Sequence, residues 1–175
     1  MLSLKSHFLE NIDVYNRAIF NNEKENISLN DDVFNLLGKV EADIIYLDPP
    51  YTGTMNNYFG FYGLIDEYIN SKKSTPFKNN FVDKKLSIEL FDRLFANLKT
   101  YKYWMLSYNN SSFPTKEQLL YLLNKYSDEV QIIERKHNYK VTGKEKKEEN
   151  KEYLFVVKNN TPISKIKKEY AREEL

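Results

Sequence analysis

The fold is decided by one stretch, Ala-Asp-Ile-Ile-Tyr-Leu-Asp-Pro-Pro-Tyr at residues 42–51, in which an apolar run ends at a carboxylate and two prolines. Residues 42–47 are mostly aliphatic and too few for a helix, so they predict a buried strand. The prolines fix φ and remove two amide donors, so the strand must end and leave acceptor carbonyls near Asp48 and Pro49. Ligands of open α/β sheets bind beyond the carboxyl ends of strands. We therefore expect a binding site at Asp48, Pro49, Pro50 and Tyr51.

The chemical groups at this strand end suit a flat ring that carries an exocyclic amino group. Asp48 and a prolyl carbonyl both accept hydrogen bonds from such an amine, and Tyr51 offers an aromatic face for stacking. The structural alternative is a turn in which Asp48 caps a helix and the prolines stiffen a loop. We favour the amino-bearing base, because four specified residues follow directly after an apolar strand.

Composition indicates one folded domain without thiol or metal chemistry. The chain has 175 residues, of which 41% are hydrophobic and 15% aromatic, which is ample for a core. It contains no cysteine and only two histidines far apart, so we expect neither disulfides nor a metal site. The first residues lack the apolar core of a signal peptide, and no apolar run reaches membrane-spanning length. We expect a soluble, cytoplasmic protein with no membrane partner.

Positive charge is concentrated near the carboxyl end, although the net charge is only +1. Residues 135–168 contain eleven Lys or Arg against four Glu, whereas residues 1–134 contain fourteen against eighteen acidic residues. Such segregation suits a strip that faces phosphates, and it suits equally well a solvated surface. On the first interpretation, the expected phosphate contacts are Lys140, Lys144, Lys146 and Lys147.

Hydrophobic periodicity and turn residues predict the remaining elements. We expect helices over residues 8–20, 33–37, 83–98 and 115–126, the last opened by a capping box of Thr115 and Gln118. Further strands are expected at residues 27–29, 101–107, 129–134 and 152–158, the last two as an antiparallel hairpin around a basic connection. Residues 52–63 mix glycine, asparagine and aromatic residues without a period, so we expect a mobile loop there and irregular chain over residues 65–80.

The tetrad at residues 48–51 resembles the Asp-Pro-Pro-Tyr motif of DNA amino-methyltransferases, in particular the adenine-specific group that includes the Dam-type enzymes. The resemblance covers roughly residues 26–158. It implies an α/β fold with a partial Rossmann-like sheet, mostly parallel with a C-terminal antiparallel hairpin, in a catalytic domain over residues 1–160. It also implies S-adenosylmethionine as cofactor, double-stranded DNA as substrate and a bacterial restriction-modification or Dam-like role. Composition separately predicts a charged tail over residues 161–175, in which Ile163, Ile166 and Tyr170 have the spacing of a terminal helix.

The resemblance also implies roles for individual residues. Asp48 and the Pro49 carbonyl would orient the amino group of a flipped adenine, Pro50 would lock the turn, and Tyr51 would stack on the base. Asp31 and Asp32, together with Asp48, would contact the cofactor; the alternative role of Asn30 or Asp31 is that of a helix N-cap. Ser107 and Asn109 would border the base, and Tyr58 and Tyr62 would stack or wedge in the duplex unless they form a small core under the loop.

One part of the family pattern is missing from the sequence. The glycines stand at positions 38, 53, 60, 63 and 143, and none forms the Phe-x-Gly-x-Gly turn that follows the first cofactor-binding strand in these enzymes. The chain thus resembles a carboxyl-terminal half: a truncated frame, a fragment or one subunit of a split enzyme with a complementary N-terminal subunit. Alone, we expect weak or no cofactor binding and no methylation. Two alternatives stay open, namely an amino-methyltransferase acting on RNA or protein, and a non-catalytic DNA-binding or partner-docking remnant.

Overall fold

The computed structural model describes residues 3–52, 58–75, 79–137 and 150–160. The chain forms two compact units, divided between Asp32 and Val33. The predicted tail at residues 161–175 lies outside the described residues, and the division into a domain at 1–160 and this tail stays a prediction. None of the described helices is both long and apolar enough to span a membrane.

The first unit consists of one helix and an extended segment. Helix α1, Leu4–Ala18, confirms the predicted amphipathic helix and begins four residues earlier than expected. The predicted strand at residues 27–29 is wrong, since no strand is assigned there. Ile27 is 74% exposed and Leu29 58% exposed, so in the described part of the chain these side chains lack the apolar partners that would bury a strand.

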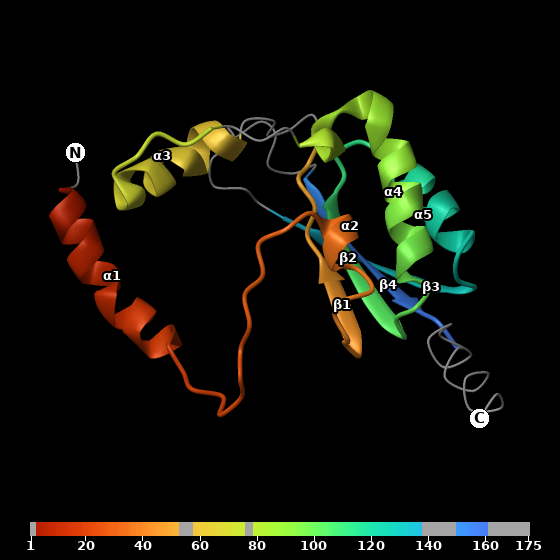
Figure 1. Cartoon of the computed structure of the whole chain (residues 1–175), viewed down its shortest axis with the longest axis horizontal. Coiled ribbons are helices and arrows are strands. Elements are labelled where there is room, and N and C mark those ends of the chain that lie inside the picture. Colours follow the sequence, from red (N-terminus) through yellow and green to blue (C-terminus); the bar gives the residue numbers. More distant parts are fainter. Residues whose placement is uncertain (1–2, 53–57, 76–78, 138–149, 161–175) are drawn as a thin grey trace. The chain divides into compact units, whose positions relative to one another are not determined.

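The second unit is built on a four-stranded mixed sheet, shown in Figure 1. The strand order is β1-β2-β4-β3; β1 pairs with β2 in parallel, whereas β2 with β4 and β3 with β4 are antiparallel. The predicted hairpin is therefore confirmed, but the expectation of a mostly parallel sheet is wrong. The strands are β1 Ile44–Leu47, β2 Tyr103–Asn109, β3 Glu129–Lys136 and β4 Lys151–Lys158.

The strand connections explain this mixture of directions. Helical chain connects β1 to β2, which allows the crossover that a parallel pair requires. After β2, helix α5 leads to β3, and the hairpin then returns the chain as β4 between β3 and β2. Because β4 runs back along β3, it is antiparallel to both of its neighbours. The helices of this unit are α2 Val33–Leu36, α3 Tyr58–Asn70, the 3-10 turn η1 Asn80–Val82, α4 Lys84–Leu98 and α5 Lys116–Asn124.

Side-chain caps fix the starts of the two helices that cover the sheet. The Asp83 carboxylate accepts a hydrogen bond from the amide of Lys85 at 2.9 Å and so caps α4. The predicted capping box of α5 is confirmed: the Thr115 hydroxyl accepts from the Gln118 amide at 3.3 Å, and the Gln118 side chain accepts from the Thr115 amide at 2.9 Å. Both helices thus begin at residues that the sequence specifies.

Helix α3 corrects the expectation of a mobile, irregular segment after the tetrad. Residues 58–70 are helical, although glycines at 60 and 63 weaken helix propensity. Gly63 is buried, and a Cβ atom there would lie 2.9 Å from the Phe59 ring, which belongs to the preceding turn. The glycine thus makes room for an aromatic ring on the helix. Residues 53–57 lie outside the described part of the chain.

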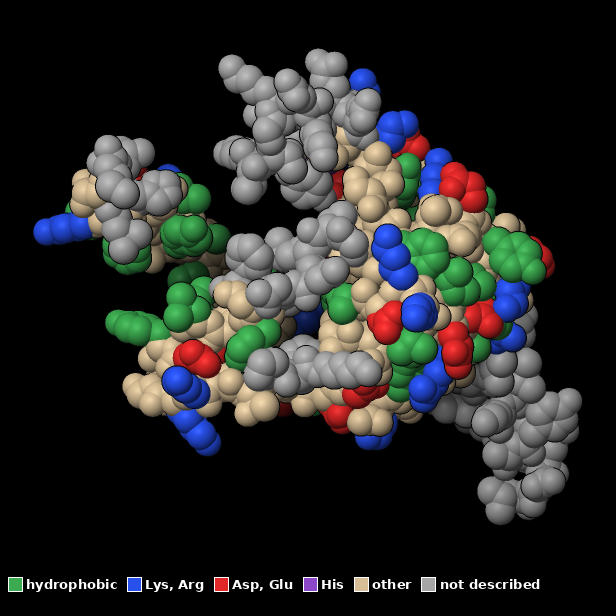
Figure 2. Space-filling model, turned by 90° about the horizontal axis from the view of Figure 1, so that it is seen from above, with side chains coloured by type: hydrophobic (Ala, Val, Ile, Leu, Met, Phe, Trp, Pro, Cys, Tyr) green, Lys and Arg blue, Asp and Glu red, His purple; other side chains and the backbone are tan. Residues whose placement is uncertain are grey.

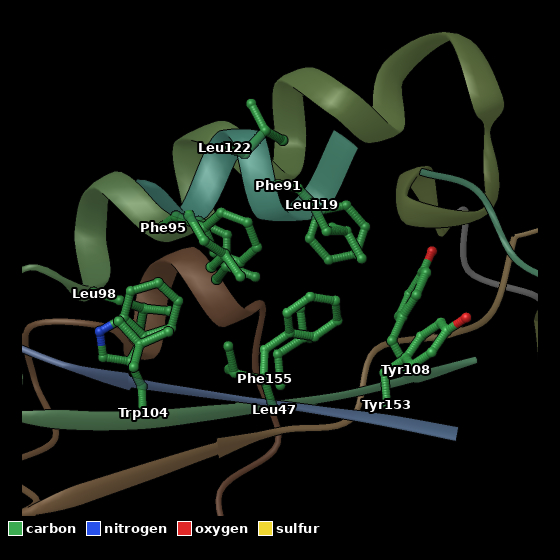
Figure 3. Packing of buried hydrophobic residues seen from close by; sticks show 14 of the residues in the cluster. Leu47, Phe91, Phe95, Leu98, Trp104, Tyr108, Leu119, Leu122, Tyr153 and Phe155 are labelled. Atoms are coloured by element: carbon green, nitrogen blue, oxygen red, sulfur yellow. The ribbon is translucent and has the colours of Figure 1, made fainter. Parts of the chain in front are cut away.

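The core lies between one face of the sheet and helices α4 and α5 (Figure 1). Figure 3 shows Phe91, Phe95 and Leu98 pointing from α4 toward the sheet, where Trp104 of β2 and Phe155 of β4 meet them. All five side chains are fully buried, and the Phe95 and Trp104 rings pack with centroids 5.3 Å apart. This layer holds the carboxyl ends of β1 and β2 in a fixed position.

Candidate functional site

The strand exit predicted from the tetrad is present. Strand β1 ends at Leu47, which is only 9% exposed and lies opposite Leu106 of β2. Asp48 follows immediately and is exposed, whereas Pro49 and Pro50 are half-buried. A solvent-exposed carboxylate therefore lies at the carboxyl end of a strand, next to a backbone stiffened by two prolines.

Thr52 anchors the backbone that follows the tetrad. It is 1% exposed, and its hydroxyl donates to the Phe81 carbonyl at 2.6 Å. It also forms an antiparallel bridge with Phe113, whose amide donates to the Thr52 carbonyl at 3.3 Å. The chain is thus attached to two separate segments directly after Tyr51, which limits how far the Tyr51 ring can move.

The Tyr51 ring packs on a rigid aromatic support. Its centroid lies 5.6 Å from that of Tyr108 at an interplanar angle of 87°, an edge-to-face contact. Tyr108 is fully buried, and its hydroxyl donates to the Phe113 carbonyl at 2.6 Å. Tyr108 also packs against Phe91 of α4, with ring centroids 5.8 Å apart. The position of Tyr51 is therefore coupled to the core.

The Tyr51 hydroxyl takes part in hydrogen bonds with two side chains, those of Ser107 and Glu152. Partial burial raises the pKa of Tyr51 to about 12, the hydrogen bond from Ser107 opposes this rise, and the negative charges of Glu152 and Asp48 add to it. Tyr51 is consequently neutral over the physiological range. A neutral phenol can donate its proton to the Glu152 carboxylate while it accepts from Ser107.

Glu152 is a site residue that the tetrad did not indicate. Burial raises its pKa, the charge of His137 and the hydrogen bond from Tyr51 act in the opposite direction, and the charge of Asp48 adds to the rise. The residue stands at the start of β4, opposite Asn109 of β2. Its only sequence signal is a carboxylate just before the apolar run of the final strand.

The structure brings the predicted residue Ser107 to the tetrad and gives Asn109 a different setting. Asn109 is 6% exposed, and its side-chain oxygen accepts from the Ser111 amide at 3.0 Å and from the Ser112 hydroxyl at 2.7 Å. These bonds are the ordinary role of asparagine in a turn. A role for Ser107 and Asn109 in contacting DNA stays a prediction.

The remaining predicted residues lie elsewhere in the chain. Asp31 and Asp32 are exposed in the first unit, and the Asp31 carboxylate accepts from the Asp32 amide at 2.7 Å. Tyr62 is 58% exposed on α3, and Tyr58 begins the same helix. Their assignments as cofactor and DNA contacts stay predictions. The four lysines predicted to face phosphates lie outside the described residues: Lys140, Lys144, Lys146 and Lys147.

The described surface shows mixed charge. On the face in Figure 2, Lys and Arg side chains stand interspersed with Asp and Glu side chains, and no continuous basic patch occurs among the residues drawn in colour. Among the described residues, Lys116 and Lys151 both form ion pairs with Glu134. The described residues also contain no group of three or more potential metal ligands.

Comparison with known proteins identifies related sequences. The sequence model of the D12 class N6 adenine-specific DNA methyltransferases matches residues 2–120. The chain is 52% identical over 157 residues to the Type II methyltransferase M2.HphI of Haemophilus parahaemolyticus, an alignment that covers 90% of this chain and 47% of that protein. It is 28% identical over 175 residues to the modification methylase StsI of Streptococcus sanguinis, covering 91% of this chain and 26% of that protein.

The alignment with a third relative also covers only part of that relative's length. The Type II methyltransferase M.FokI of Planomicrobium okeanokoites is 24% identical over 160 residues, covering 83% of this chain and 24% of that protein. The chain therefore spans about half the length of M2.HphI and about a quarter of the other two relatives. No solved structure matches the chain.

Proposed function

Because this chain belongs to the D12 class of N6-adenine-specific DNA methyltransferases, we propose that it forms the part of such an enzyme that holds the target base. The whole enzyme would transfer a methyl group from S-adenosylmethionine to the exocyclic nitrogen of an adenine in double-stranded DNA. The observation that carries the proposal is the exposed Asp48 at the end of β1, next to the supported ring of Tyr51.

The tetrad offers acceptors for both protons of an adenine amino group. The Asp48 carboxylate would accept one proton and the Pro49 carbonyl, which has no strand partner in the described part of the chain, would accept the other. These two bonds would direct the nitrogen lone pair away from the ring plane, so that it can attack a methyl group. Holding the nitrogen in this near-attack geometry is the main catalytic contribution that this chain can make.

Tyr51 would hold the adenine ring by stacking once the base has left the duplex. Enzymes that modify a base inside a duplex rotate it out of the stack, and an aromatic side chain compensates for the stacking that is lost. Stacking of a base on an aromatic residue contributes about 1 to 3 kcal/mol. Because Tyr108 and Thr52 restrain Tyr51, little additional ordering of its ring would be required on binding.

The described residues fit the target amine better than they fit the cofactor. The family uses S-adenosylmethionine as methyl donor. Its charged amino-acid part requires close approach of backbone at a glycine-bearing turn after a strand. Gly38 has a φ of 89°, but it lies between α2 and β1, and not after a strand. We therefore assign no step at the sulfonium centre to this chain, and propose Asp31 and Asp32 only as further cofactor contacts.

We further propose that a second segment, in the same or another polypeptide, supplies the rest of the cofactor site. The coverage of 47% of M2.HphI supports this, because a relative of high identity needs additional chain of similar length. The names of the relatives, Type II methyltransferase and modification methylase, support a role in a bacterial restriction-modification system, acting on DNA in the cytoplasm.

A second candidate function is DNA binding without methyl transfer. The absence of the Phe-x-Gly-x-Gly turn from the sequence favours it, because a chain that never meets a complementary segment would lack the cofactor. The two candidates differ in whether addition of that segment restores transfer.

Reconstitution tests the proposal. The full chain would be mixed with the portion of M2.HphI that it does not align with, and transfer of tritiated methyl groups to duplex DNA, RNA and protein would be measured. We expect transfer to duplex DNA and a loss of about 100-fold in rate for Asp48→Asn, comparable to removal of a group that orients the reacting atoms. DNA binding should change less than about two-fold, because neutralising one carboxylate adds no clash.

A matched control lies at the other end of the same strand. Asp43 is exposed and precedes β1 by one residue, so Asp43→Asn removes a carboxylate from the same strand without touching the tetrad. Its methylation rate should equal that of the unsubstituted chain. Equal rates for Asp48→Asn and Asp43→Asn would refute the assignment of Asp48, and methylation of RNA or protein in place of DNA would refute the substrate.

A further inference from the structure

Three strands bring polar side chains to one edge of the sheet around Tyr51. Strand β1 leads into the tetrad, β2 carries Ser107, and β4 begins with Lys151 and Glu152. The strand pairing places Glu152 opposite Asn109, and Ser107 two residues earlier in β2, so Ser107 and Glu152 project from the same face of the sheet. The Tyr51 hydroxyl contacts both of these side chains.

The two hydrogen bonds have a defined direction. An ionised carboxylate has no proton to donate, so the Tyr51 phenol donates to Glu152. The phenol has only one proton, so the Ser107 hydroxyl donates to the phenol oxygen. The order is therefore Ser107 to Tyr51 to Glu152. A phenol proton bound by a carboxylate is a charge-assisted hydrogen bond, which is stronger than one between neutral groups.

These contacts hold the Tyr51 ring at two points. The ring packs nearly perpendicular to the buried ring of Tyr108, and the hydroxyl at the far end of the Tyr51 ring is held by Ser107 and Glu152. The hydroxyl oxygen lies on the Cβ–Cγ axis, so its hydrogen bonds restrain the direction of this axis. Because the O–H bond of a phenol prefers the plane of the ring, the directional bond to Glu152 also favours one rotation of the ring about the axis, in addition to the contact with Tyr108. The plane decides whether a flat base can lie parallel to the ring.

We propose that Glu152 is a positioning residue, whose carboxylate fixes the plane of the Tyr51 ring for stacking on the target base. This inference rests on the proposed function, and it assigns to the start of β4 a role that the tetrad alone does not have. Other titratable or charged groups also face Glu152: Asp48 and the neutral Tyr51 from the strand exit, His137 from the end of β3, and Arg135 opposite it in the β3–β4 pairing.

The first test measures the contact itself and needs no substrate. In the full chain, the Tyr51 ring would be followed by NMR of tyrosines labelled at Cζ, with the resonance assigned by its loss in Tyr51→Phe. Removal of the Glu152 charge should lower the pKa of Tyr51 from about 12 toward its ordinary value. The control Glu129→Gln changes an exposed glutamate paired with Lys158 at the far end of β3, and should leave the Tyr51 titration unchanged.

The second test measures stacking. The probe is a duplex that carries 2-aminopurine opposite an abasic site, whose fluorescence falls when the base stacks on an aromatic ring. Glu152→Gln and Tyr51→Phe should each weaken the quenching titration about 10-fold, the effect of losing one hydrogen bond to a charged group. The double variant should lose no more than about two-fold further, because both substitutions remove the same hydrogen bond between the phenol and a charged carboxylate. Glu152→Asp should recover part of the loss, since it retains the carboxylate.

The outcomes separate the inference from the proposed function. A changed Tyr51 titration together with a 10-fold weaker quenching in Glu152→Gln supports the inference. An unchanged Tyr51 titration in Glu152→Gln overturns it, whatever the probe shows. If the unsubstituted chain fails to quench the probe, the role of Tyr51 in holding a base is refuted, and the positioning role of Glu152 falls with it. Circular dichroism would confirm that each variant is folded.

Discussion

Removal of one buried hydroxyl, that of Tyr108, should destabilise the second unit. The hydroxyl donates to the Phe113 carbonyl at 2.6 Å, and Tyr108 is fully buried between Phe91 and Tyr51. In Tyr108→Phe the ring contacts stay, but the Phe113 carbonyl loses its donor. Loss of one partner of a buried hydrogen bond costs about 1 to 3 kcal/mol. We therefore expect a decrease of about 2 kcal/mol in the free energy of unfolding, the middle of that range.

Urea unfolding monitored by intrinsic fluorescence measures this effect. Trp104 is the only tryptophan of the chain and is fully buried in β2, so its emission reports on the unfolding of this unit. The midpoint should fall while the slope with urea stays the same. Tyr121→Phe is the matched control, since Tyr121 is 71% exposed on α5, and it should change stability by less than about 0.5 kcal/mol. Equal midpoints for the two variants would refute the reasoning.

Two further predictions follow from side chains that fix local structure. Thr115→Ala removes half of the capping box of α5 and should lower the free energy of unfolding by about 1 kcal/mol in the same urea assay, whereas Thr115→Ser should stay close to the unsubstituted chain. The pKa of Tyr51, raised by burial from 10.0 to about 12, makes stability depend on alkaline pH, because the unfolded chain releases this proton first. The stabilisation from the protonated phenol is complete below pH 10 and disappears between pH 10 and about 12. The free energy of unfolding of Tyr51→Phe should therefore decrease less over this pH range than that of the unsubstituted chain. Identical dependence on pH for the two proteins would contradict the assignment.

Local sequence signals predicted the elements whose determinants are close together in the chain. The proline pair after Leu47 ended β1 where expected, because proline acts on its own backbone and its neighbour. The capping box at Thr115 and the apolar stripe of α4 are also local signals, and both correctly predicted their helices. At the site, the exposure of Asp48 and the proximity of Ser107 followed from the rule that strand ends meet at one edge.

The predictions that were wrong concern features whose structure depends on contacts with residues far away in the sequence. Residues 27–29 have the composition of a strand but form none, because a short apolar run needs a neighbouring strand to bury it. The glycines at 60 and 63 favoured a loop, although packing of Phe59 against Gly63 is compatible with a helix. Whether neighbouring strands pair parallel or antiparallel could not be predicted from single strands, because side chains alternate between the two faces in the same way in both kinds of pair. Glu152 was missed because its partner, Tyr51, lies about a hundred residues earlier.

The placement of β4 between β2 and β3 has a consequence for the order of folding during synthesis. Of the four described strands, the one that comes last in the sequence occupies an inner position of the sheet, so β2 and β3 cannot be joined until residues through Lys158 have left the ribosome. The nascent chain should therefore keep the inner edges of β2 and β3 unpaired until nearly all of the described residues have been translated. A stop codon before β4 would remove the strand that connects the sheet, and with it the carboxylate that faces Tyr51.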